Sequence, residues 1–150
     1  MRILSSAGIA YTVKEYPVNE SALSALHVAE YLEIPAEQVF KTLVLQGASG
    51  ACTVCCIASS TDLDLKKTAK ATGEKSIALI PVKDILPLTG YVRGGCSPIG
   101  MKKSFVTTID ESAAQFETII FSAGKIGFQL EMKLEELHKA IRFQQANITV

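Results

Sequence analysis

Residues 40–58 read FKTLVLQGASGACTVCCIA, and this stretch decides the fold. Two apolar runs, residues 40–46 and residues 51–58, flank turn-forming residues at 47–50, and this pattern predicts a β-hairpin. Both runs are apolar on both faces. We therefore expect the two strands to lie in the middle of a sheet rather than at its edge.

Short strands and helices alternate on either side of this hairpin. The patterns predict further strands at residues 11–16, 77–80, 105–109, 118–121 and 127–131, and helices at residues 24–32, 62–72, 82–86 and 133–141. Thr61-Asp62-Leu63-Asp64 resembles a capping box with Asp in the place of Glu, at the start of the second of these helices. We expect an α+β fold: a single domain over residues 1–150 with a mixed, mostly antiparallel sheet and packed helices.

Composition limits the kinds of protein this can be. The chain has 150 residues, of which 48% are hydrophobic, and this is enough to close one core. No apolar run reaches the roughly 18 residues that cross a bilayer, and the N-terminus lacks a secretory pattern, so we expect a soluble, cytoplasmic protein with no membrane partner. The 15 basic and 15 acidic residues cancel, so any contact with nucleic acid must use a local patch.

The four cysteines do not form a convincing metal motif. Cys52 and Cys55 have the spacing of half a zinc site, but no second such pair follows. Thiols buried in a strand are the better interpretation, because free cysteine behaves as a small hydrophobic residue. We expect no metal, no cofactor and no disulfide.

Lys41 is anomalous because it lies within an apolar strand. Alternation places it on one face with Leu43 and Leu45. Its side chain either extends from the strand end to water or supplies a fixed ammonium group to a pocket beside the sheet. A triad built on histidine is not expected, because the two histidines, His27 and His138, are both predicted on helices.

A glycine-rich loop occupies residues 90–103, which read GYVRGGCSPIGMKK. It concentrates four glycines, one proline and three cations in fourteen residues. Such a loop is either an ordinary surface turn or a segment whose main chain approaches a ligand closely.

Four segments that follow one another along the chain carry a family resemblance. They are FKTL at 40–43, LDLKKTAK at 63–70, TGYVRGGCSPIG at 89–100 and SAGK at 122–125. In order and spacing they resemble the YbaK family of aminoacyl-tRNA deacylases, which are relatives of the editing domain inserted in bacterial prolyl-tRNA synthetases.

The resemblance implies an enzyme that removes a wrongly attached amino acid from tRNA, and the YbaK branch implies Cys-tRNA(Pro). It also implies that the substrate's own thiol attacks the ester, so that Lys41 is the catalytic residue and holds the acceptor end or stabilises negative charge. Cys96 is then expected to pack in the loop rather than act as a nucleophile. The substrate-binding residues implied by the resemblance are Tyr16, Thr42, Gly94, Gly95, Cys96, Ser97, Pro98, Ser122 and Gly124.

The cations of these segments are candidates for contact with tRNA: Lys66, Lys67, Lys70, Arg93, Lys102, Lys103 and Lys125. The resemblance implies prolyl-tRNA synthetase as a further partner that could supply the choice of tRNA. Two departures from the family pattern, at residues 25–30 and at Glu33, leave the amino acid open, and a third, Ile126, removes one possible contact with phosphate. A deacylase for another amino acid such as alanine, and a non-catalytic module that binds a small ligand or tRNA, therefore stay as alternatives.

Overall fold

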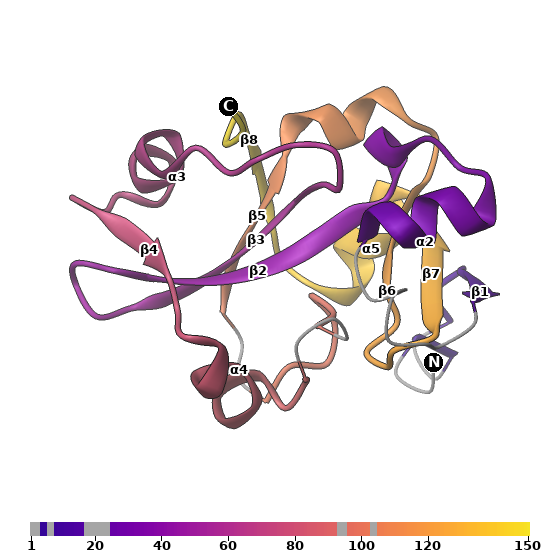
Figure 1. Cartoon of the computed structure of the whole chain (residues 1–150), viewed down its shortest axis with the longest axis horizontal. Coiled ribbons are helices and arrows are strands. Elements are labelled where there is room, and N and C mark those ends of the chain that lie inside the picture. The colour runs from indigo at the N-terminus through magenta and orange to yellow at the C-terminus, as the bar shows by residue number, and fades with distance from the viewer. Residues whose placement is uncertain (1–3, 6–7, 17–24, 93–95, 103–104) are drawn as a thin grey trace.

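The hairpin predicted at residues 40–58 forms, and it lies in the middle of the larger of two sheets (Figure 1). Its strands are β2 (Phe40–Gly47) and β3 (Cys52–Ala58), which pair antiparallel with Leu43 opposite Cys55. The predicted central position of both strands is confirmed, because each has a further strand on its other side.

The computed structural model describes residues 4–5, 8–16, 25–92, 96–102 and 105–150. The other strands are β1 (Thr12–Glu15), β4 (Ile77–Leu79), β5 (Val106–Asp110), β6 (Ile119–Ser122), β7 (Phe128–Met132) and β8 (Gln144–Ala146). The helices are α2 (Ala25–Leu32), α3 (Leu65–Thr72), α4 (Val82–Thr89), α5 (Leu134–Ala140) and the 3₁₀ helices η1 (Ala36–Gln38) and η2 (Glu111–Gln115).

The strands form two sheets rather than one. The larger sheet has the order β4-β2-β3-β5-β8, and the smaller sheet has the order β1-β7-β6. Four of the strand pairs are antiparallel, and the pairs β3–β5 and β5–β8 are parallel. The predicted α+β class and the mostly antiparallel pairing are confirmed. The expected single sheet is divided into two, and η2 connects β5 of the larger sheet to β6 of the smaller sheet along the chain.

One apolar core joins the two sheets. Buried side chains from the larger sheet meet buried side chains from the smaller sheet in this cluster; among them are Val54, Cys56, Ile109, Phe121, Leu130 and Met132. Each Val, Ile, Leu, Phe or Met side chain of this core contributes about 1.5–3 kcal/mol when it is fully buried. The relative position of the two sheets is therefore fixed by packing, and any site between them has rigid walls.

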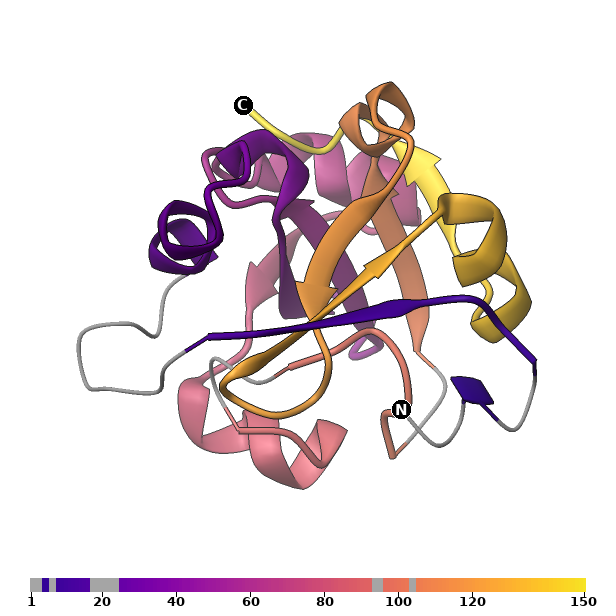
Figure 2. The same ribbon diagram turned by 90° about the vertical axis from the view of Figure 1, so that its right-hand side faces the viewer.

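Helices α3 and α4 lie on opposite sides of the larger sheet (Figures 1 and 2). Helix α3 packs on a second apolar cluster that contains Leu45, Cys55 and Ile57. It begins later than predicted, because Asp64 rather than Thr61 caps it: the Asp64 carboxylate accepts a hydrogen bond of 3.0 Å from the main-chain N–H of Lys67. The hydroxyl of Thr61 instead donates to the carbonyl of Ala58.

Candidate active site

A cavity of about 290 Å³ lies beside strand β2, bordered by strands of both sheets and by α4. Much of its wall is apolar, and the residues that line it are Tyr16, Val28, Phe40, Lys41, Thr42, Leu43, Val44, Leu79, Ile80, Val82, Ile85, Cys96, Ser122 and Gln129. The cavity brings together Lys41, Thr42, Tyr16, Cys96 and Ser122, which lie far apart in the sequence and which the resemblance had indicated together.

The cavity lies at an open part of the edge of β2. Strand β4 pairs with β2 only at residues 45–47, and the last contact is the Ile80 N–H, which donates to the Val44 carbonyl at 3.1 Å. Beyond that point the chain turns away into α4. Because hydrogen-bonded pairs alternate along β2 and β3, the main-chain N–H and C=O of Thr42 point toward this open edge and away from β3.

The open edge also explains how Lys41 reaches the cavity. Alternation places Lys41 on the same face as Leu43 and Leu45, the face that α3 covers. Side chains from both faces of β2 can border the cavity here, because β4 does not cover the edge between residues 40 and 44. Lys41 is half-buried and makes no hydrogen bond or ion pair with any other residue that the structure describes.

Lys41 is the one charged group among the described residues that line the cavity. An ammonium group without a partner, beside a largely apolar wall, attracts negative charge more strongly than it would in open water. The geometry therefore suits the stabilisation of a developing oxyanion or of a phosphate oxygen.

Three polar residues of the cavity come from the smaller sheet: Tyr16, Ser122 and Gln129. Ser122 and Gln129 are directly opposite each other in the β6–β7 pair, and Tyr16 follows β1, where its N–H donates to the carbonyl of Gly127. The hydroxyl oxygen of Ser122 accepts a hydrogen bond of 3.1 Å from the N–H of Gly124. Sequence reasoning missed Gln129, for which the available signal was a polar residue in an apolar strand.

Cys96 borders the cavity as a buried, neutral thiol. Burial raises the pKa of Cys96 above its ordinary value, and the thiol donates a weak hydrogen bond to the carbonyl of Val92 at 3.8 Å. A thiol with a raised pKa carries little thiolate near neutral pH. This supports the expectation that Cys96 packs in the loop and does not act as a nucleophile.

The glycine-rich loop is anchored by Tyr91. Its hydroxyl donates a hydrogen bond to the carbonyl of Ile99, and its ring lies against Gly124 in the β6–β7 turn. Ser97 and Pro98 are buried, and the hydroxyl oxygen of Ser97 accepts from the N–H of Ile99 at 3.3 Å.

Not every residue indicated for the loop lines the cavity. Ser97, Pro98 and Gly124 are absent from its described lining and instead hold the loop and the turn beside it. Gly94, Gly95, Arg93 and Lys103 lie outside the described residues.

The candidate cations divide between two faces of the protein. Lys66, Lys67 and Lys70 are exposed on α3, on the far side of the larger sheet from α4 (Figure 1). Lys67 is engaged there, because its ammonium group donates to the carbonyl of Thr149 at 2.8 Å.

Lys102 and Lys125 are exposed near the loop and the turn that flank the cavity. The Lys102 side chain packs against Gly90, and the Lys125 ammonium lies 5.5 Å from the centre of the Phe128 ring. Sequence reasoning did not single out Lys83, which is exposed on α4 beside Val82 of the cavity wall.

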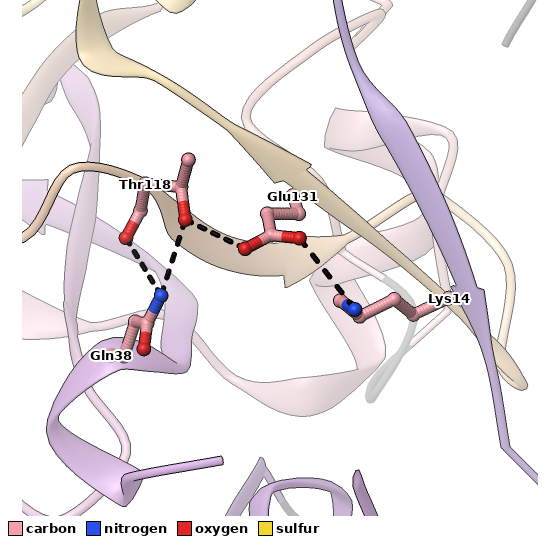
Figure 3. A network of polar contacts seen from close by, with 4 residues as sticks. All are labelled: Lys14, Gln38, Thr118 and Glu131. Atoms are coloured by element: carbon pink, nitrogen blue, oxygen red, sulfur yellow. Dashed lines mark hydrogen bonds and ion pairs between the residues drawn. The ribbon is translucent and has the colours of Figure 1, made fainter.

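A chain of polar contacts ties the smaller sheet to the start of β2 (Figure 3). The Gln38 amide donates to the carbonyl and the hydroxyl oxygen of Thr118, whose hydroxyl donates to Glu131 at 2.7 Å. The other carboxylate oxygen of Glu131 lies 3.6 Å from the Lys14 ammonium. Gln38 precedes Phe40 of the cavity by two residues and Glu131 follows Gln129 by two, so these contacts connect segments of both sheets that contribute residues to the cavity lining.

The part of the chain that the structure describes has no cluster of three or more His, Cys, Asp or Glu side chains that could hold a metal ion. All four cysteines are free thiols. None of the helices in the described ranges has the length and apolar character that a bilayer crossing requires.

The fold matches that of a solved structure over nearly the whole chain. A solved structure described as "Crystal structure of a putative trans-editing enzyme for prolyl tRNA synthetase" superposes with a TM-score of 0.87 and 22% identity, covering 99% of this chain and 93% of that chain. At this level of identity the likeness establishes the architecture.

The chain belongs to the aminoacyl-tRNA editing domain family, which matches residues 19–140. It is 44% identical, over 99% of its own length and 91% of the relative's, to "Putative Cys-tRNA(Pro)/Cys-tRNA(Cys) deacylase EbsC" of Enterococcus faecalis. The resemblance stated from the sequence is thereby confirmed.

More distant relatives are much longer proteins. A proline–tRNA ligase of Burkholderia multivorans is 27% identical over 69% of this chain, and the match covers 18% of the ligase.

Proposed function

We propose that this protein is a trans-editing deacylase that clears mischarged tRNA in the cytoplasm, with Cys-tRNA(Pro) as its main substrate. The observation that carries the proposal is the 44% identity, over nearly the whole chain, to a relative named for the deacylation of cysteinyl-tRNA. The need for such an enzyme is chemical: a binding site separates similar small side chains by only about 1–3 kcal/mol, so a second, hydrolytic sieve is required.

The residues that line the cavity have the chemical groups that this proposal needs for an aminoacyl ester. Its described lining contains one cation, several hydroxyl groups and no histidine or carboxylate. Such a lining suits a reaction whose nucleophile is brought by the substrate, because the enzyme then needs to hold the ester and to stabilise the oxyanion.

The reaction we propose uses the thiol of the cysteinyl group. Its sulfur attacks the ester carbonyl, the new C–S bond forms, the bond from the carbonyl carbon to the ribose oxygen breaks, and the thiol proton passes to that oxygen. The products are the cyclic thiolactone of cysteine, which water later opens, and tRNA with a free terminal hydroxyl. Lys41 stabilises the carbonyl oxygen as negative charge develops on it. No cofactor takes part.

Other lining residues have supporting roles in this proposal. The open edge of β2 at Thr42 offers main-chain hydrogen bonds, and Tyr16 and Ser122 offer hydroxyl groups on the opposite sheet. The main chain of the glycine-rich loop, at Gly94 and Gly95, receives the terminal adenosine or the ester, and the buried Ser97 and Pro98 hold the loop in place for this contact. Prolyl-tRNA synthetase, or its complex with tRNA, supplies the choice of tRNA, since the net charge of zero gives the chain no strong field of its own.

A panel of charged tRNAs tests the proposal. Cys-tRNA(Pro), Cys-tRNA(Cys), Ala-tRNA(Pro), Ser-tRNA(Pro) and Pro-tRNA(Pro) are incubated with the protein, and the remaining ester is measured over time. We expect Cys-tRNA(Pro) to be cleared fastest and Pro-tRNA(Pro) to survive. Clearance of Ser-tRNA(Pro) or Ala-tRNA(Pro) at the same rate would exclude attack by the substrate thiol.

The matched variants are Lys41→Ala and Lys41→Met, both of which should fold because Lys41 has no partner among the described residues. Loss of an oxyanion-stabilising group lowers the rate about 10²–10³-fold. An unchanged rate in both variants would remove Lys41 from the mechanism. Binding of every charged tRNA without deacylation of any would instead favour a non-catalytic module.

A further inference from the structure

Gln129 is a polar side chain of the cavity for which the described residues supply no partner. It lies in β7 with 5% of its surface exposed, and it lines the cavity. Its amide makes no hydrogen bond to any residue that the structure describes. Ser112 Oγ is the one side-chain oxygen or nitrogen in the described residues that is both fully enclosed and unpaired, so the Gln129 amide keeps some access to the cavity.

An amide in this position faces the cavity without a hydrogen-bond partner among the described residues, so it is open to a ligand. Burying an amide without a hydrogen bond costs free energy, and an apolar side chain of the same shape avoids this cost. Lys14 is opposite Gln129 in the β1–β7 pair, but it does not pair with the Gln129 amide. Its ammonium group lies 3.6 Å from Glu131 instead. Within the described residues, both the oxygen and the NH₂ group of Gln129 are therefore available to a ligand.

The charge of Lys41 determines which group of an aminoacyl ester forms a hydrogen bond with Gln129. Lys41 attracts the ester oxygen and repels the α-amino group, which is cationic in its protonated form. The amino group therefore favours hydrogen-bond acceptors away from Lys41. Gln129 and Ser122 are such acceptors, paired opposite each other in the smaller sheet, and the Ser122 oxygen has one lone pair already occupied by the Gly124 N–H.

We propose that Gln129 receives the α-amino group of the aminoacyl ester through its amide oxygen, with Ser122 as the second acceptor. This inference rests on the proposed function and deepens it. The α-amino group is common to all aminoacyl-tRNAs, so Gln129 identifies the class of substrate and positions it. Discrimination between side chains is left to the apolar wall of the cavity.

Two uncleavable compounds test this role. The first is 3′-deoxyadenosine carrying a cysteinyl group on a 3′-amino group, and the second carries 3-mercaptopropanoyl, which is the same group without its α-amino substituent. Dissociation constants are measured by calorimetry. We expect the wild-type protein to bind the first compound about 10-fold or more tightly than the second, as one hydrogen bond to a charged group provides.

The variant Gln129→Met keeps the length of the side chain and removes the amide. We expect it to bind the two compounds equally and to have a thermal midpoint no lower than that of the wild type, because no hydrogen bond within the described residues is removed. Gln129→Glu, which restores an acceptor, should recover the preference for the amino compound. A lower thermal midpoint for Gln129→Met with an undiminished preference would overturn the proposal.

The two proposals fail in different ways. If the wild type deacylates Cys-tRNA(Pro) but binds both compounds equally, the role of Gln129 is wrong and the proposed function stands. If the preference depends on Gln129 but no charged tRNA is deacylated, the binding role stands and the catalytic proposal fails. Lys41→Ala is the control, since it should lose deacylation and keep the preference for the amino compound.

Discussion

Gly124 lies directly against the ring of Tyr91. A Cβ atom on Gly124 would come within 2.8 Å of Tyr91 Cε1, a separation that real Cβ atoms essentially never show. Through this contact the β6–β7 turn, which follows Ser122 of the cavity, supports the residue that anchors the glycine-rich loop to the carbonyl of Ile99. The position of the loop beside the cavity thus depends on the absence of one side chain.

We expect Gly124→Ala to displace Tyr91, to weaken its hydrogen bond to Ile99 and to lower both stability and deacylation. Gly124 also has a φ of 96°, which an alanine adopts only with strain of about 1–2 kcal/mol. Urea unfolding and the rate with Cys-tRNA(Pro) measure the two effects.

Gly50→Ala is the matched control for that change. Gly50 has a φ of 90°, close to that of Gly124, but nothing lies within 4 Å of the Cβ position. It should show the conformational strain alone and retain full activity. Equal losses of activity in the two variants would show that the contact between Gly124 and Tyr91 does not matter to the site.

Glu33 provides a second prediction about backbone conformation. It has a φ of 57° at the end of α2, where the Ile34 N–H donates to the Ala29 carbonyl and the Glu33 N–H donates to the Glu30 carbonyl. This is the Schellman arrangement, in which glycine is the favoured residue.

We therefore expect Glu33→Gly to raise the free energy of unfolding by about 1 kcal/mol, because the strain of a side chain at positive φ is removed. Glu33→Ala keeps the Cβ atom and should give no such gain. The measurement is urea unfolding of both variants, and a stabilised alanine variant would show that the charge of Glu33, rather than its φ, is unfavourable.

The hairpin and the glycine-rich segments could be predicted from the sequence because their signals are local. Alternation along residues 40–46 and the turn at 47–50 are sufficient to place β2 and β3. The face of Lys41 follows from the same alternation. Its access to a cavity does not, because that depends on β4 pairing with residues 45–47 alone, which is a relationship between distant segments.

The division into two sheets and the place of Gln129 in the cavity wall could not be predicted from the sequence, because both depend on contacts between distant segments. β8 has only three residues, and it pairs with β5 through long-range contacts that no short pattern indicates. Gln129 is distinctive through its burial in the cavity wall, which can be seen only once β1, β6 and β7 are assembled. Asp64 caps α3 from three residues after Thr61, and a capping motif alone does not distinguish the two.

The four thiols should differ sharply in reactivity. Burial raises the pKa of Cys55 to about 12 and that of Cys56 to about 12, and it also raises the pKa of Cys96. Because the thiolate is the reactive form, these three should resist iodoacetamide at pH 7–8 in the native protein, and their alkylation should increase as the pH is raised. Cys52, which is partly exposed, should be modified first.

Mass spectrometry of the alkylated peptides measures this order. The activity of Cys96→Ser is the companion measurement, and we expect it to lie within a few-fold of the wild type, since in our proposal the substrate thiol, and not Cys96, is the nucleophile. Rapid alkylation of Cys96 with loss of activity at pH 7 would contradict both statements.

The two groups of exposed lysines lie on different faces of the protein, and substitutions in each group test from which face tRNA approaches. Lys83 and Lys125 are exposed beside the cavity, on α4 and on the β6–β7 turn, whereas Lys66 and Lys70 are exposed on α3, across the larger sheet. If the terminal nucleotide enters the cavity, as we propose, the phosphates next to it lie nearest the first group. We expect Lys83→Gln with Lys125→Gln to weaken binding of Cys-tRNA(Pro) and to reduce its dependence on salt, by about 0.7–0.9 in the logarithmic slope for each phosphate that is no longer neutralised.

Lys66→Gln with Lys70→Gln is the charge-matched control and should change neither quantity. A larger effect of the α3 pair would mean that the body of the tRNA crosses the far face of the sheet while its end reaches round the open edge of β2.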